Sequence, residues 1–140
     1  MFQAMKKAGI GNEYVNQLGD WKYMLNNGMT TFGEWKINPR SECHSWSASP
    51  SYDFLSTICG IEPASPGFKA VKIEPNIGNL KNVEGTFYHP RGNIVVKYIV
   101  NDQKQMIAEV NIPPAITGNF VWKGKVYPLK TGRSSFTLLF

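Results

Sequence analysis

The sequence predicts an α+β fold with segregated parts, in which helices come first and an antiparallel β-sandwich follows. Up to about residue 62, apolar residues recur at helical spacing. From residue 63 onward they alternate at period two, and turn-forming residues occur about every ten positions. These two patterns divide the chain into a helical part, residues 1–62, and a sandwich, residues 63–140.

Two helices are expected in the first thirty residues. The first covers residues 2–8 and stops at Gly9. Asn12 is a suitable N-cap for the second, which ends at Gly28. The second helix is amphipathic because four large apolar residues fall on one side of it: Tyr14, Leu18, Trp21 and Leu25.

A loop over residues 29–42 separates the second helix from a third helical segment, which runs from about residue 43 to 59 and ends at Gly60. Pro50 either kinks this segment or starts its main part, with Ser49 as the N-cap. Three helices of this size bury too little apolar surface to stand alone. We therefore expect residues 1–62 to be the last helices of a larger helical domain.

About seven short strands account for the second part of the chain, a number typical of an antiparallel sandwich. The first begins at residue 68 and uses the alternation of Val71 and Ile73 with charged neighbours. The others are expected over residues 85–88, 93–100, 105–112, 119–122, 125–127 and 134–139.

Composition excludes several classes of protein. Of the 140 residues, 42% are hydrophobic and 13% aromatic, which argues against disorder. No apolar run approaches the ~18 residues of a membrane-spanning helix, and the first residues lack the apolar run of a signal peptide. The net charge of +5 comes from scattered lysines and arginines, a pattern that favours a solvated basic surface over a nucleic-acid interface.

The two cysteines, Cys43 and Cys59, match neither a zinc nor a thioredoxin spacing. We expect two buried thiols rather than a disulfide. No grouping of ligand residues indicates a metal site, and no phosphate loop or dinucleotide fingerprint indicates a cofactor.

The segment from residue 28 to 50 carries the candidate site. Glu34 stands in a glycine-containing turn beside Phe32 and Trp35, and ten residues later His44 stands close to Trp46. Indole and phenyl rings stack on sugar rings, while a fixed carboxylate binds hydroxyls or activates water. Together these residues predict a carbohydrate site, in which Arg40 is expected to pair with Glu34 or Glu42.

Several irregular motifs occur in a fixed order along this half of the chain. They are Gly-x-Thr-Thr-Phe-x-Glu-Trp at 28–35, Arg-Ser-x-Cys-His-x-Trp-Ser-Ala-x-Pro at 40–50, Ile-Cys-Gly-Ile at 58–61, Pro-Gly-Phe at 66–68 and Ile-Glu-Pro at 73–75. The segment resembles the catalytic-domain end of bacterial α-L-rhamnosidases, glycoside hydrolase family 78. The similarity fades after about Tyr98.

This resemblance implies an (α/α)6 catalytic barrel, of which residues 1–62 would be the last helices, followed by a small C-terminal β-sandwich. It implies that Glu34 is the general base of an inverting glycosidase acting on α-L-rhamnosides. The general acid would come from the rest of the parent barrel, since no stretch here matches it. His44, Trp46 and Trp35 are the expected substrate-binding residues. The two indoles could instead fill the wall behind Glu34, and for Trp35 the wall is favoured. Gly33 departs from the family, in which a bulky residue more often precedes the glutamate.

Two other functions remain open at this point. The first is a non-catalytic module, either carbohydrate-binding or structural, whose sugar affinity would lie in the sandwich and be independent of Glu34. The second is a different (α/α)6 glycosidase. The order of Glu34, His44 and Trp46 and the Pro-Gly-Phe motif at 66–68 favour a rhamnosidase over both.

Overall fold

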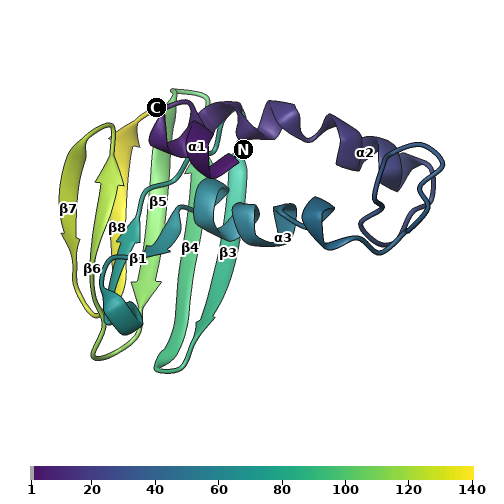
Figure 1. Ribbon diagram of the computed structural model, residues 1–140. Helices are drawn as coiled ribbons and strands as arrows, with labels where there is room; N and C mark the ends of the chain where they lie inside the picture. The colour runs from purple at the N-terminus through teal and green to yellow at the C-terminus, as the bar shows by residue number, and fades with distance from the viewer. Residues whose placement is uncertain (1) are drawn as a thin grey trace.

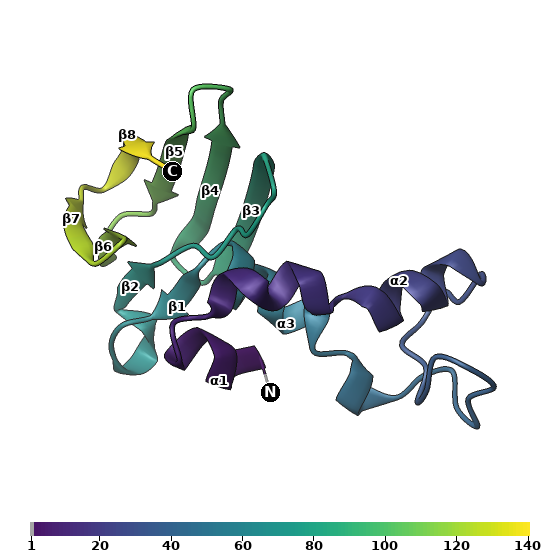
Figure 2. The ribbon, with the colours of Figure 1, turned by 90° about the horizontal axis from the view of Figure 1, so that it is seen from above.

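The computed structural model describes residues 2–140, in which two four-stranded sheets pack against each other and a helical arm projects to one side (Figures 1 and 2). One sheet has the order β3-β4-β5-β8, with bounds Asn82–His89, Gly92–Val100, Gln105–Ile112 and Gly132–Leu139. The other has the order β1-β2-β6-β7, with bounds Ile61–Pro63, Ala70–Ile73, Thr117–Trp122 and Lys125–Leu129.

The predicted sandwich is confirmed, with two corrections. β2 pairs with β6 in parallel, so the second sheet is not purely antiparallel. β1 was not expected, since its three residues include a proline and are too few to show alternation. Alternation identifies a strand and its buried face but says nothing about the direction of its partner, which explains the first error.

The inward faces of the strands form the core. In β4, Ile94, Val96 and Tyr98 are fully buried and alternate with more exposed neighbours. β5, the neighbour of β4 in the same sheet, adds Met106, Ala108, Val110 and Ile112, each at most 1% exposed. Phe120 of β6 closes the core from the other sheet.

The helices are more broken than the sequence predicted. After α1, Phe2–Lys7, the expected second helix is a 3-10 helix, η1 (Gly11–Gln17), and a separate α-helix, α2 (Gly19–Asn26). Asn12 caps no helix, and its Oδ1 instead accepts a hydrogen bond from the Gly78 amide. Leu25, the last residue of the predicted apolar stripe, is 70% exposed, so within this chain the stripe is covered only in part.

The third helical segment consists of three short pieces, a 3-10 turn η2 (Ser45–Ser47), an α-helical turn α3 (Pro50–Asp53) and a π-helical turn η3 (Phe54–Ile58). Pro50 starts the main part of this segment, which is one of the two predicted alternatives, the other being a kink at Pro50. Ser49 is not an N-cap, because it already has helical torsions and makes no side-chain cap bond. A further 3-10 turn, η4 (Pro66–Phe68), connects β1 to β2.

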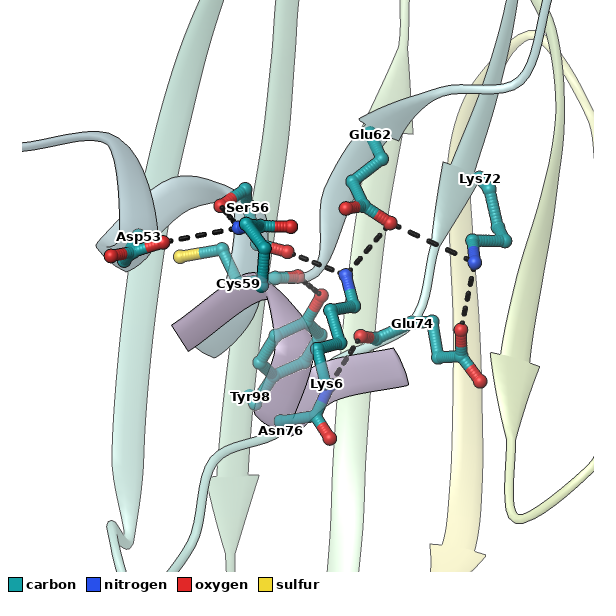
Figure 3. Close-up of polar contacts among 10 residues, drawn as sticks. Lys6, Asp53, Ser56, Cys59, Glu62, Lys72, Glu74, Asn76 and Tyr98 are labelled. Carbon is teal, nitrogen blue, oxygen red and sulfur yellow. Dashed lines mark hydrogen bonds and ion pairs between the residues drawn. The ribbon is translucent and has the colours of Figure 1, made fainter. Parts of the chain in front are cut away.

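Part of the helical region packs directly on the sandwich. Phe2, Tyr14 and Ile58 belong to the same buried cluster as the inward residues of the strands. Figure 3 shows the polar contacts at this junction, where Lys6 Nζ lies 2.8 Å from a Glu62 carboxylate oxygen and donates to the Ser56 carbonyl at 2.7 Å. The sandwich therefore supplies some of the apolar partners that the first helices need.

The expectation of two buried thiols holds for one residue. Cys59 is buried, and burial raises the pKa of its thiol to about 11. Cys43 is exposed because its loop leaves the body of the molecule, which the expectation missed. Within residues 2–140 no helix is both long and apolar enough to cross a membrane.

Candidate functional site

The candidate site lies at the end of the helical arm, in the loop between α2 and η2, away from the two sheets (Figures 1 and 2). α2 ends at Asn26, and the expected stop at Gly28 follows: the Gly28 amide bonds to the Leu25 carbonyl and the Met29 amide to the Met24 carbonyl. The positive φ of Gly28, 78°, allows this turn and sends the chain into the loop.

The two limbs of the loop are held together by backbone hydrogen bonds. The Glu34 amide donates to the Ser41 carbonyl at 2.8 Å, and the His44 amide donates to the Phe32 carbonyl at 2.6 Å. The Thr31 hydroxyl donates to the Glu42 carbonyl. These bonds bring the two sequence motifs side by side, so that residues ten positions apart meet at one place.

Glu34 is buried at the centre of the loop, with 4% of the residue exposed. Arg40 contacts both of its carboxylate oxygens: Nε donates to Oε2 at 3.0 Å, and Nη2 donates to Oε1. The hydrogen bonds and charge of this guanidinium hold the pKa of Glu34 below its ordinary value, against the effect of burial, and the nearby His44 acts in the same direction. The predicted pairing of Arg40 with Glu34 is confirmed.

The aromatic residues of the prediction gather beside Glu34. The rings of His44 and Trp46 lie 4.1 Å apart, and those of Trp46 and Trp35 lie 6.0 Å apart. Trp46 Nε1 lies 3.3 Å from the Glu34 carbonyl oxygen, to which it donates. Both indoles are more than half exposed, Trp35 at 56% and Trp46 at 62%, so their faces are open to a ligand.

The departure at Gly33 has a local explanation. Gly33 is buried, and the Met29 methyl group occupies the space where a Cβ would stand. In this chain the Met29 side chain therefore occupies the space inside the loop next to residue 33. A larger side chain at position 33 would occupy that space itself.

An open cleft of about 390 Å³ lies over Glu34. Residues of α2 form one wall and the loop forms the other; the lining residues are Asp20, Trp21, Met24, Glu34, Trp35, Lys36, Ile37 and Ser47. The sequence analysis missed the Asp20–Lys36 ion pair in this cleft, which spans 2.7 Å. The placement of Asp20 depends on the break at Gly19, for which the sequence pattern gives no signal.

Chemically, the site offers one buried carboxylate, an imidazole and two exposed indoles. Among residues 2–140, no three His, Cys, Asp or Glu side chains are grouped as metal ligands would be. The second carboxylate of the cleft, Asp20, is more exposed than Glu34 and is neutralised by Lys36. The arrangement fits recognition of a polyhydroxyl ring together with proton transfer to Glu34.

Comparisons with known proteins point to one family. The model of the bacterial alpha-L-rhamnosidase C-terminal domain matches residues 60–134. The chain is 29% identical over 151 aligned residues to an alpha-L-rhamnosidase of Alteromonas sp. (strain LOR). The alignment covers 85% of this chain and 16% of that protein.

Solved structures agree on the fold. The alpha-L-rhamnosidase of Aspergillus terreus superposes with a TM-score of 0.88 at 19% identity, over 97% of this chain and 18% of that one. The Streptomyces avermitilis alpha-L-rhamnosidase, solved in complex with L-rhamnose, gives a TM-score of 0.71 at 19% identity, over 84% of this chain and 14% of that one. The chain spans less than a fifth of each of these relatives. Because the family model covers more than half of its residues, the chain belongs to the family of bacterial alpha-L-rhamnosidase C-terminal domains.

Proposed function

We propose that this chain supplies the last part of the catalytic barrel, residues 1–62, and the sandwich, residues 63–140, of an inverting α-L-rhamnosidase. The observation that carries the proposal is the meeting of Glu34, His44 and Trp46 in one loop of a chain whose sandwich belongs to a rhamnosidase family. On this view the enzyme removes terminal α-L-rhamnosyl residues from glycans or glycosides.

Glu34 is the general base in this mechanism. Its carboxylate takes a proton from a water molecule, whose oxygen forms a bond to the anomeric carbon from the face opposite the leaving group. The glycosidic C–O bond breaks, and an acid on another part of the barrel gives its proton to the leaving oxygen. In inverting enzymes the two carboxyl groups stand about 6.5–9.5 Å apart to make room for the water.

The neighbouring side chains hold the sugar in position. The exposed indoles of Trp46 and Trp35 offer stacking faces, and the imidazole of His44 can hydrogen-bond to a rhamnose hydroxyl. The position of His44 against Trp46, with 4.1 Å between ring centres, supports this role because it keeps the imidazole beside the aromatic residues near Glu34.

The apolar outside of the arm supports a place within a larger barrel. Tyr23, Leu25, Tyr52 and Phe54 are each more than 40% exposed. An apolar cleft of about 260 Å³ lies on the same arm, lined in part by Met24, Leu25 and Phe54. Exposed apolar surface of this kind is typical of an interface, and here we assign it to the remaining helices of the barrel.

The test is made on the intact parent enzyme. Wild type and Glu34→Gln are assayed on an aryl α-L-rhamnoside while NMR follows the anomer of the released sugar. We expect inverted L-rhamnose from the wild type, and a fall in kcat of about 10²-fold or more in the variant with binding retained. Glu42→Gln, an exposed carboxylate of the same loop, is the matched control and should stay near wild type.

Full activity in Glu34→Gln would remove the base role. An inactive wild type on every rhamnoside would favour the second candidate function, sugar binding by the sandwich. A cleft of about 490 Å³ between η1 and the sandwich favours this alternative, since it combines the aromatic residues Trp122 and Phe140 with the amides of Asn12, Asn16 and Asn79. Its test is a titration of the chain with L-rhamnose, in which NMR shifts would appear at Trp122 rather than at Glu34.

A further inference from the structure

The proposed base is covered in the free protein. The Glu34 side chain is 1% exposed, whereas the Arg40 side chain bound to it is 81% exposed. A general base has to come within hydrogen-bond reach of the water that it deprotonates. Both carboxylate oxygens accept from Arg40, and the exposed guanidinium lies between the buried carboxylate and solvent, so water has almost no access to Glu34 in this arrangement.

Little besides this ion pair holds Arg40 in place. Among residues 2–140 the guanidinium bonds to Glu34 alone, and four-fifths of the Arg40 side chain faces solvent. By contrast, Glu34 is fixed from the backbone side, since its amide bonds to Ser41 and its carbonyl accepts from Trp46. Arg40 is thus the less constrained partner of the pair, and Glu34 is the more constrained one.

We propose that Arg40 is a displaceable cover for Glu34: its guanidinium shields and orients the carboxylate in the free protein and swings away when a sugar enters the cleft. This inference rests on the proposed role of Glu34 as the base. It makes Arg40 a positioning residue, since it acts through Glu34 and not on the reacting atoms.

The other charges around Glu34 do not replace Arg40. His44 lies on the opposite limb of the loop and also favours the ionised carboxylate, but less than Arg40 does. Asp20 of α2 and Lys36 of the loop line the same cleft and neutralise each other at 2.7 Å. Removing Arg40 should therefore raise the pKa of Glu34 toward its ordinary value and open the carboxylate to solvent.

The test uses the 140-residue chain itself, so that it does not depend on rhamnosidase activity. Carboxyl NMR gives the pKa of Glu34 in wild type, Arg40→Ala and Arg40→Gln, and labelling with a water-soluble carbodiimide and glycine ethyl ester gives its accessibility. We expect a higher pKa and labelling at least tenfold faster in both variants. Lys22→Ala, which removes an equally charged, exposed residue of α2 that does not line the cleft, is the matched control and should change neither.

An unchanged pKa and unchanged labelling in both Arg40 variants would overturn the inference. In the intact parent enzyme, the acidic limb of the kcat/KM profile should move to higher pH in Arg40→Ala, because this limb reports the free base. The parent enzyme could be inactive on rhamnosides while Arg40→Ala still raises the pKa and the labelling rate of Glu34. In that case the proposed function is wrong, and the proposal that Arg40 covers Glu34 is supported. A loss of about 10²-fold in kcat with the limb unmoved would show instead that the guanidinium is needed during the reaction.

Discussion

Tyr98 is the polar residue most deeply placed in the sandwich. Its hydroxyl donates to the Cys59 carbonyl at 2.7 Å, and burial raises its pKa well above the ordinary value, so it stays a donor (Figure 3). Tyr98→Phe leaves this buried carbonyl without a partner and should lower the free energy of unfolding by about 1–3 kcal/mol, measured by urea denaturation. Tyr88→Phe, at 81% exposure, should change it by less than about 0.5 kcal/mol. Equal values for the two variants would contradict this account.

The two thiols should differ sharply in reactivity. Cys43 is exposed. Cys59 is buried and has a pKa of about 11, so at pH 8 only a small fraction of the protein carries Cys59 as a thiolate. With a disulfide reagent at pH 8 we expect one thiol to react in the native protein and two in denaturant. Cys43→Ser should abolish the native reaction. A native reaction that persists in this variant would show that the Cys59 region opens readily.

At the scale of elements, Gly60 joins the last helical turn to β1 with φ of 76°, and an added Cβ would overlap the Glu74 backbone. Gly60→Ala should therefore lower the free energy of unfolding by more than about 2 kcal/mol, since a left-handed alanine alone costs about 1–2. Gly9→Ala is the control, because Gly9 has the same φ with nothing within 4 Å of the added methyl. Equal losses in thermal or urea unfolding would mean that the overlap is relieved by a small shift.

An element can be predicted from the sequence when local patterns of residues determine it, and not when tertiary contacts do. Strand β5 has the predicted bounds because its alternation is unbroken and Asn101–Asp102 marks a turn before it. The break between η1 and α2 was not predicted, because Gly19 lies inside a continuous helical pattern and the packing of Tyr14 against Phe2 fixes only the first half. Tertiary contacts decide such breaks, and local sequence does not contain them.

The candidate site follows the same rule. The motifs placed Glu34, His44 and Trp46 in one segment, residues 28–50, and the structure brings them together across the loop and η2. The sequence did not show that Glu34 would be covered, since burial of a loop carboxylate depends on the backbone bonds between the two limbs. Their roles in substrate binding and catalysis stay predictions until the Glu34 variants are measured.

Across the whole molecule, Lys6 connects the first helix to the sandwich. Its side chain is 9% exposed and bonds to Glu62 and Ser56, while Lys72 also reaches Glu62 at 3.7 Å (Figure 3). Lys6→Met should lower the free energy of unfolding by about 2 kcal/mol or more, because a carboxylate and a carbonyl lose their main partner. Lys22→Met, at an exposed position of α2, is the control.

The same variant tests whether the helices and sheets unfold together. One buried cluster spans both, so far-UV circular dichroism and tryptophan fluorescence should report a single transition in the wild type and in Lys6→Met. Separate midpoints would show that the helical part detaches first.

The parallel pairing of β2 with β6 also determines when the second sheet can form during synthesis on the ribosome. β2 leaves the exit tunnel early, but the strand to which it bonds, Thr117–Trp122, is made much later. Until β6 is made, the sheet against which α1 and η1 pack is incomplete, and the apolar residues of these two helices stay exposed to solvent. Such distant pairings slow folding and lengthen exposure to aggregation. A ribosome-bound chain with β6 still inside the tunnel should therefore bind chaperones, and one whose residue 140 is held outside the tunnel by an added linker should release them.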